Sequence, residues 1–410
     1  MNSFLSIALS SAAFIHLIDT IAEGASIGIN QILLLPSCAE SELLASELGD
    51  AVASAIDNKT QRNGGGSRVV SPYELTLPWS DWLGYLTASD ANSMTLEEFF
   101  ESYCWMTATV TILGNNDPDL AQKAFRRVLD WSSRVSRRSQ PQVYRSPAIC
   151  LIATVDETSD CQELPTGEPL LSVHTLWGMP SATELRTICQ QLEPAGNAET
   201  LWRECIVAGL GAGDVMLSQN LWRSRFKSQQ EIIEHVMTMW DPLPIGTHVP
   251  RAPVEPLRPP RSPLFSAWAS GRAVGSPEYG SEFHLSAIPG DHSALREEVL
   301  HRLWRAQVQT VMVATDRTRR EGIETIRRFT GSQWEKWVTE SSMTDYERRR
   351  IHGDPWDAQL GFLSWLSDKL EIEHRQLFSP VSLRLRHANE ARRMVAHFEP
   401  VDYPIFSKVF

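Results

Sequence analysis

The most informative segment for the fold class lies near the start of the chain, where Ile29-Asn30-Gln31-Ile32-Leu33-Leu34-Leu35 is followed by Pro36-Ser37-Cys38-Ala39-Glu40. The first run is short and almost wholly apolar, which is typical of a strand that is buried on both faces of a sheet. Helical patterns are predicted before it, over about residues 5–22, and after it, from Ser41 to Ala55. A buried strand between two helices predicts a parallel sheet in which helices make the crossovers.

The same alternation continues along the first half of the chain. Three further apolar runs predict strands: Thr107–Leu113, Ala148–Val155 and Leu170–Leu176. Helical patterns cover about Asp119–Arg134, Ala182–Leu192 and Glu199–Trp240. Ser181 precedes the second of these helices and Glu184 falls in its first turn, which is a capping pattern. We therefore expect residues 1–240 to form an α/β domain.

The composition changes sharply after Trp240. Ten of the 24 prolines fall between Pro242 and Pro289. Because proline fixes φ and lacks an amide donor, this segment cannot be a regular helix or a central strand. We expect residues 241–292 to form a linker or an extended arm that can pack along a neighbour.

The part of the chain after this segment is almost wholly helical in pattern. Ser293 is expected to cap a long amphipathic helix in which Leu295, Val299 and Leu303 recur at near-helical spacing. Further helices are predicted over 320–329, 332–340, 343–351, 356–377 and 386–397. Residues 293–410 are thus predicted to be an all-α domain with short loops.

Targeting signals and cysteines indicate the compartment. The apolar run Phe4–Leu17 has no positively charged residue before it, since the first Lys or Arg is Lys59. No window reaches the roughly 18 uninterrupted apolar residues of a membrane span. The six cysteines are scattered and form no C-x-x-C pair, as expected of buried, reduced thiols. We predict a cytoplasmic protein that makes no membrane contact.

The order of these elements resembles a P-loop NTPase domain of the AAA+/STAND type. In an active member the first strand runs into G-x-x-x-x-G-K-[ST], whose backbone amides and lysine hold phosphates. Between Pro36 and Leu44 this chain has no glycine and no lysine, and Glu40 and Glu42 would repel a triphosphate. A later strand ending in Asp156-Glu157 resembles a Walker B segment, although a buried strand with a polar exit turn explains it as well.

Degenerate domains of this kind are similar to the inactive STAND domains of multi-component prokaryotic conflict and antiphage systems. That resemblance implies a non-catalytic scaffold or regulatory subunit that binds a protein partner of the same system. We expect no catalytic residue, no cofactor-binding residue, no metal ligand and no cofactor. The sequence leaves the partner and the oligomeric state open.

Two local patterns could suggest ligand sites. The run Gly209-Leu210-Gly211-Ala212-Gly213-Asp214 is glycine-rich, but a helical pattern and not a strand precedes it, so a corner between two helices is predicted. Several potential metal ligands lie close together, namely His284, Asp291, His292, Glu297 and Glu298. Their spacing matches no recognised zinc pattern, so no metal site is predicted.

Two alternative functions stay open for the second half. Arg392-x4-His397 resembles the Arg/His pair of HEPN-type ribonucleases, in which the two side chains stabilise and protonate a cleaving phosphodiester. In place of the polar residue usual in that family, Arg393 follows Arg392. The second alternative is a nucleic-acid-binding module that uses arginine clusters such as Arg348-Arg349-Arg350.

Charge weighs against that second alternative. The net charge of −12 argues against non-specific coating of nucleic acid. Acidic residues also interleave with the arginines, which favours a solvated, salt-bridged helical surface. Tryptophans of the same half are expected to pack in the core or in an interface; they are Trp304, Trp334, Trp337, Trp356 and Trp365.

Overall fold

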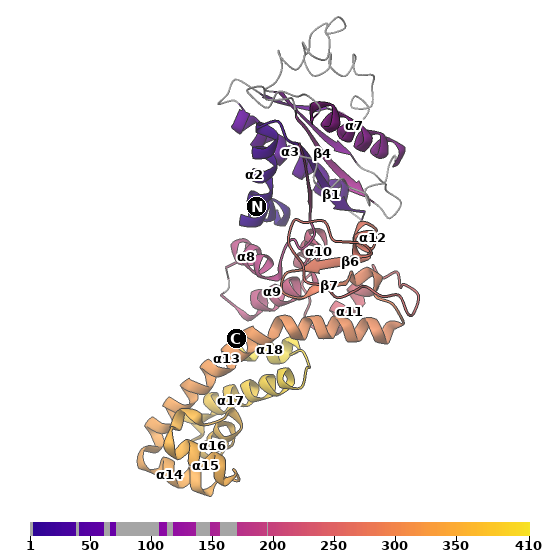
Figure 1. The fold of residues 1–410 in the computed structure, drawn as a ribbon. Helices are drawn as coiled ribbons and strands as arrows, with labels where there is room; N and C mark the ends of the chain where they lie inside the picture. Colours follow the sequence, from indigo (N-terminus) through magenta and orange to yellow (C-terminus); the bar gives the residue numbers. More distant parts are fainter. Residues whose placement is uncertain are drawn as a thin grey trace, which may run out of the picture. The chain divides into compact units, whose positions relative to one another are not determined.

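The computed structural model describes residues 3–37, 41–60, 66–70, 106–112, 118–136, 148–155, 170–194 and 196–410. The chain divides into two compact units (Figure 1). The first unit comprises Met1–Leu192, Gly211–Asn220 and Trp240–Pro289. The second comprises Glu193–Leu210, Leu221–Met239 and Gly290–Phe410.

The first unit is built on a five-stranded sheet in the order β2-β3-β4-β1-β5, in which all strand pairs are parallel. The strands are β1 (Asn30–Pro36), β2 (Gly66–Val70), β3 (Met106–Ile112), β4 (Ala148–Val155) and β5 (Leu171–Thr175). In the register of the sheet, Leu33 of β1 lies between Ile152 of β4 and His174 of β5. The predicted parallel α/β sheet is confirmed, and β2 is a strand that the sequence did not indicate.

Helices cover both faces of this sheet. Figure 1 shows α2 (Ala12–Ser26) and α3 (Ser41–Thr60) on one side and α7 (Pro118–Ser136) on the other. Alternate residues of β1, Ile32 and Leu34, share a buried cluster with α7. Because successive side chains of a strand point to opposite faces, a central strand between helices must be apolar throughout, as β1 is.

The proline-rich segment is part of the first unit. It holds α12 (Leu264–Ala269), the antiparallel hairpin of β6 (Ala273–Ser276) and β7 (Gly280–Phe283), and the 3₁₀ turn η4 (Leu285–Ala287). Val254, Phe265 and Trp268 are buried in the same cluster as α7 and the sheet. The expectation for 241–292 was a linker or an extended arm that packs along a neighbour. Apolar side chains between its prolines belong to the core of the first unit.

The shorter helices of the first unit follow local signals. The predicted helix over 5–22 is two helices, α1 (Phe4–Leu9) and α2. Helix α8 (Ala182–Leu192) begins with a capping box, since the Ser181 hydroxyl accepts the Glu184 amide and the Glu184 carboxylate accepts the Ser181 amide. Helix α10 (Val215–Arg223) begins in this unit, and its last three residues belong to the second.

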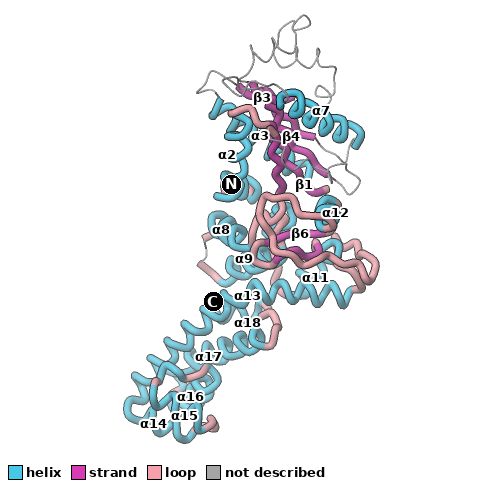
Figure 2. The backbone as a smooth tube through the Cα atoms, in the orientation of Figure 1, coloured by secondary structure: helices cyan, strands magenta, loops and turns pink. Residues whose placement is uncertain are grey.

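The second unit is helical, as Figure 2 shows. Its helices are α9 (Ala198–Leu210), α11 (Gln229–Met237), α13 (His292–Thr330), α14 (Trp334–Glu340), α15 (Asp345–Gly353), α16 (Leu360–Glu373), α17 (Arg375–Ala396) and α18 (Tyr403–Val409). Two 3₁₀ turns, η5 (Gly331–Gln333) and η6 (Pro355–Asp357), complete it. The core between α13, α14, α16 and α17 contains Ile326, Trp334, Phe362, Leu366 and Phe378.

Three boundaries in this unit differ from expectation. Asp291, not Ser293, caps α13, with its carboxylate accepting the amides of Ser293 and Ala294. The helix predicted separately over 320–329 is the last part of the 39-residue α13. The helix predicted over 356–377 breaks at His374, and α17 continues through Pro380 from Arg375.

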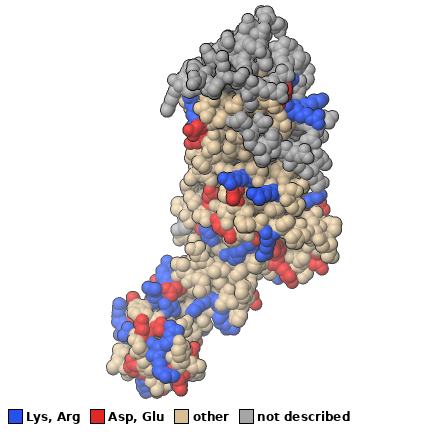
Figure 3. Space-filling model, viewed as in Figure 1, with Lys and Arg blue, Asp and Glu red and all other residues tan. Residues whose placement is uncertain are grey.

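No helix in the described part of the chain combines the length and the apolar character needed to cross a bilayer. On the face drawn in Figure 3, basic and acidic side chains lie interspersed over the part of the helical unit built from α14, α15 and α16.

Candidate functional site

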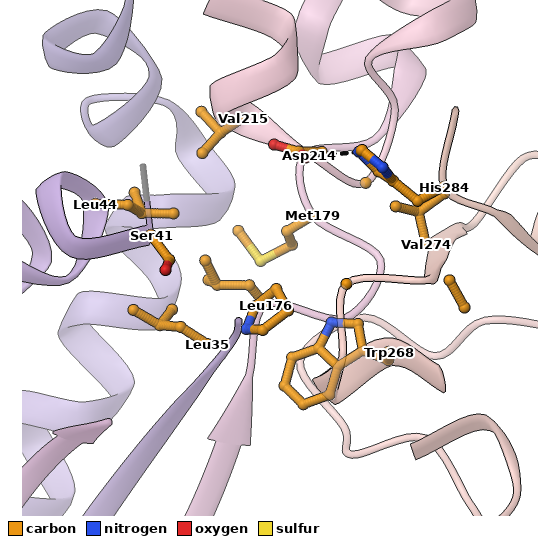
Figure 4. A pocket seen from close by; sticks show the side chains of 14 residues that line it. Leu35, Ser41, Leu44, Leu176, Met179, Asp214, Val215, Trp268, Val274 and His284 are labelled. Carbon is orange, nitrogen blue, oxygen red and sulfur yellow. Dashed lines mark hydrogen bonds and ion pairs between the residues drawn. The ribbon is translucent and has the colours of Figure 1, made fainter. Parts of the chain in front are cut away.

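The carboxyl end of the parallel sheet is the natural place for a ligand in this fold. A pocket lies there, at the end of β1 and the start of α3, and it belongs wholly to the first unit (Figure 4). Most of its walls are apolar, contributed by Leu35, Leu44, Leu176, Met179, Val215, Trp268 and Val274. Its polar side chains are Ser41, Asp214 and His284.

Helix α12 of the proline-rich segment lies against the end of β1. The backbone amide of Ser37, the first residue after β1, donates to the carbonyl oxygen of Ala269 at 2.8 Å. Trp268 beside it is 2% exposed and forms part of the pocket wall. The amide that follows the first strand is thus engaged by the chain's own backbone.

The same segment also pairs with the chain that leaves β5. The Thr175 amide donates to the carbonyl of Leu257 at 3.2 Å, and the Leu257 amide donates to the carbonyl of Trp177 at 3.0 Å. Gly178, at φ +78°, follows directly and faces Val254, leaving no room for a side chain. Backbone hydrogen bonds and close packing therefore fix the segment to the ends of both β1 and β5.

The residues of this pocket do not fit a nucleotide with its magnesium ion. The open volume is about 30 Å³, close to the share of one water molecule and far below the roughly 300 Å³ of a small ligand pocket. The connection from β1 to α3 holds only residues 37–40, of which Cys38, Ala39 and Glu40 lie outside the described residues. Neither a lysine nor a glycine stands between Pro36 and Leu44 to bind phosphate.

Asp214 and His284 form the polar side of the pocket (Figure 4). One oxygen of Asp214, Oδ2, lies 3.0 Å from Nε2 of His284, and the other accepts the backbone amides of Met216 and Leu217. Burial by itself acts to raise the pKa of Asp214, but the hydrogen bonds from His284 and the two amides hold this pKa below its ordinary value. Asp214 therefore caps α10 as a carboxylate and ties it to the segment after β7.

A serine extends this pair into a series. Nδ1 of His284 lies 2.6 Å from the hydroxyl of Ser286, so Ser286, His284 and Asp214 are hydrogen-bonded in line. This series of serine, histidine and aspartate resembles the catalytic triad of serine hydrolases. However, Nδ1 also accepts the backbone amide of Ser286, and Ser286 is not part of the pocket wall. The three side chains therefore fix the η4 turn to α10, and no local spacing in the sequence could have brought Asp214 and His284 together.

Strand β4, which resembles a Walker B strand, lies directly beside β1. The acidic pair Asp156-Glu157 that carries this resemblance lies outside the described residues. Cys150 in the middle of β4 is fully buried, and its burial raises the pKa of its thiol to about 12. A thiol in this state is not a nucleophile at neutral pH.

The glycine-rich run is a corner between two helices, as predicted. Helix α9 ends at Leu210, and Asp214 caps α10 four residues later. Gly209 lets α9 approach α13, because a Cβ there would lie 2.8 Å from the Cβ of Ala306. Gly213, at φ +86°, lies against the carbonyl oxygen of Gly275 in the hairpin. Gly209 and Gly213 therefore have packing roles.

The potential metal ligands between His284 and Glu298 are engaged separately. His284 pairs with Asp214, Asp291 caps α13, and Glu298 forms an ion pair with Arg302 at 2.6 Å. Within the described ranges, no group of three or more His, Cys, Asp or Glu side chains is arranged to hold a metal ion.

The arginine clusters of the second unit are largely neutralised by neighbouring carboxylates. Arg348 pairs with Asp345, and Arg350 pairs with Asp357. Arg384 pairs with Glu321, while Arg386 reaches both Asp368 and Glu371. His352 bonds to the Glu335 carboxylate. These contacts are those of a salt-bridged helical surface.

Arg392 and His397 lie on α17 and at its end, and they have different surroundings. Arg392 is a half-buried residue, and its guanidinium donates to Oε1 of Gln359 at 2.9 Å. His397 is the exposed C-cap of the helix. Five residues of helix separate them by about 140° around the helix axis, so they do not share a face.

No protein-family model matches the chain, and no curated protein matches it. Among solved structures, the Aeropyrum pernix ORC2 protein in its ADPNP-ADP complexes matches with 12% sequence identity and a TM-score of 0.27. The match covers 55% of this chain and 62% of that chain, which is less than two thirds of the ORC2 structure. A TM-score of 0.27 is too low to support an argument about function.

Proposed function

We propose that the chain is a non-catalytic scaffold or regulatory subunit that mediates protein–protein interaction in a multi-component prokaryotic system. The observation that carries the proposal is the hydrogen bond from the Ser37 amide to the Ala269 carbonyl. In the P-loop domains that the sequence resembles, phosphate binds after the first strand, and in this chain α12 lies against the residue that follows β1. The resemblance to inactive STAND domains of antiphage systems suggests the kind of system.

The chemistry of the same region supports this role. Among the described residues of the pocket, the Asp214 carboxylate is shared between His284 and the amides of α10. Catalysis needs polar groups that are aimed at a substrate in a cavity large enough to hold it. The pocket has about 30 Å³ of open space, so its groups serve the fold.

The experiment is affinity purification of the tagged full-length chain from its native host, with nuclease added and without nucleotide in the buffer. The proposal expects a protein partner at near-stoichiometric amount that is absent from a control purification with an unrelated tagged protein. Elution of the chain alone under all conditions would contradict it. A hydrolysis assay with ATP and magnesium on the same preparation should give no activity above a buffer control.

A further inference from the structure

A second cavity lies inside the helical unit, away from the strand ends. It has a volume of about 200 Å³ and is open to solvent, and it lies between α13, the η6 turn, the start of α16, and α17. This volume is several times the roughly 30 Å³ that one water molecule occupies, so a side chain of another molecule can enter it. The cavity has charged walls and an apolar rim.

The arginines in and beside the wall contact carboxylates, with the exception of Arg392. Asp316 pairs with Arg319 and with Arg320, at 2.7 and 2.9 Å. Asp357 pairs with Arg350 at 3.0 Å. Arg392, in contrast, has no carboxylate partner among the described residues and donates only to the neutral amide oxygen of Gln359.

The Arg392 guanidinium has a neutral hydrogen-bond partner where its neighbours have a carboxylate. A guanidinium binds a carboxylate or phosphate through two parallel hydrogen bonds. The free donors of Arg392 therefore offer a site for an oxyanion brought by a ligand. The rim adds apolar surface, since Met312 is 40% and Trp356 is 41% exposed.

We infer that this cavity is a docking site for an acidic side chain of a partner protein, whose carboxylate pairs with Arg392 while a flanking aliphatic side chain packs on Trp356 and Met312. The inference rests on the proposed function and identifies the surface that would carry it. A singly charged carboxylate fits better than a dianionic phosphate group, because Asp316 and Asp357 also form the wall.

Nucleic acid is a less suitable ligand for this surface. A phosphate backbone needs a row of cations free to bind successive phosphates. Around the cavity, Arg319, Arg320 and Arg350 are each held by a carboxylate. One arginine that lacks a carboxylate partner among the described residues, beside an exposed indole, is suited to a single carboxylate with an apolar neighbour.

The test uses the full-length chain with ¹⁵N-labelled tryptophan, and follows the indole signal of Trp356, assigned with Trp356→Phe. The probes are the peptides acetyl-Leu-Glu-Leu-amide and acetyl-Leu-Gln-Leu-amide, phosphoserine in the same peptide frame, and a ten-residue oligothymidine. The glutamate peptide should shift the Trp356 signal saturably. It should bind about tenfold or more tightly than the glutamine peptide, the gain expected from a hydrogen-bonded charge.

Arg392→Gln should remove that preference, whereas Arg393→Gln should keep it. Arg393 is the neighbouring exposed arginine and is not part of the cavity wall. Equal binding of the glutamate and glutamine peptides, no shift with either, or tighter binding of the phosphoserine peptide or the oligothymidine would each overturn the inference.

The affinity purification separates this inference from the proposed function. A partner that is captured by wild type and lost with Arg392→Gln, but not with Arg393→Gln, supports both. If wild type and both variants capture the partner equally, the scaffold role is supported and this docking site is overturned. If the peptide binds but no partner is captured, the carboxylate site is supported and the scaffold role is contradicted.

Discussion

The backbone amide of Ser37 lies 2.8 Å from the carbonyl oxygen of Ala269, although the two residues are far apart in the sequence. Ser37 is the first residue after the central strand β1, and Ala269 ends helix α12. In a phosphate-binding domain, amides at this position are kept for the ligand. In this chain the carbonyl of Ala269 accepts the Ser37 amide, and Trp268 packs beside this hydrogen bond. The proline-rich segment therefore lies at the end of β1.

Packing of this segment can be tested at Gly178. An added Cβ there would lie 2.6 Å from Cγ1 of Val254 and 3.3 Å from Cα of Pro256. Gly178→Ala should therefore cost about 1–2 kcal/mol for the left-handed backbone and a further ~1–3 kcal/mol for overpacking. The free energy of unfolding is measured by denaturant titration with circular dichroism.

The matched control is Gly246→Ala. Gly246 has φ +95° but nothing within 4 Å of the added Cβ, so only the backbone cost applies. If the two variants lost equal stability, the close approach of Val254 to Gly178 would be wrong.

Trp268 should contribute strongly to the stability of the first unit. Its side chain is 2% exposed and shares a cluster with Ile32, Leu34 and the helix α7. Trp268→Ala should lower the free energy of unfolding by about 3–5 kcal/mol, as for other buried aromatic side chains. Ile245→Ala, in the same segment but 88% exposed, should change it by less than about 0.5 kcal/mol. A small effect at Trp268 would show that the segment is not part of the core.

Acid should destabilise the first unit through His174. Nε2 of this residue lies 2.9 Å from Oε1 of Gln31, and burial lowers its pKa from 6.5 to about 4. The unfolded chain therefore binds a proton that the folded chain does not, between pH 6.5 and about 4. The contribution of this residue to stability is complete above pH 6.5 and decreases as the pH falls, by at most about 3 kcal/mol.

The comparison is between His174→Gln and wild type in unfolding titrations at pH 7 and pH 4.5. His174→Gln should lose less stability than wild type over this interval. An unchanged pH dependence in His174→Gln would contradict a neutral, half-buried His174.

The ribonuclease alternative makes a separate prediction. Because Arg392 donates to Gln359 whereas His397 is the exposed C-cap of α17, we expect the full-length chain to cleave no RNA and His397→Ala to change nothing. The measurement is cleavage of a labelled RNA, with circular dichroism to check the helical content. RNA cleavage by wild type that disappears in His397→Ala at unchanged helical content would instead establish the ribonuclease.

Local patterns were sufficient for four of the five strands of the sheet and for several helix ends. The apolar run of β4 was predicted at its exact bounds, Ala148–Val155, because a strand buried on both faces has a continuous apolar sequence. The helix Ala182–Leu192 was also exact, since Ser181 and Glu184 form a capping box. In both cases, neighbouring residues determine the structure.

Long-range contacts were beyond the reach of such patterns. The prolines of the 241–292 segment correctly exclude a long helix, but they do not reveal that Phe265 and Trp268 are buried against the sheet. Asp214 and His284 are 70 residues apart, and no local sequence motif connects them. The cavity at Arg392 likewise depends on three helices meeting, whereas the sequence marked Arg392 only through its spacing from His397.

The most direct test of the central claim is calorimetric titration of the full-length chain with ATP and with GTP, each with magnesium. We expect no binding at millimolar nucleotide, because α12 lies against the end of β1 and the pocket has room for about one water molecule. Binding at micromolar affinity would contradict it, and would make the chain a nucleotide-responsive protein.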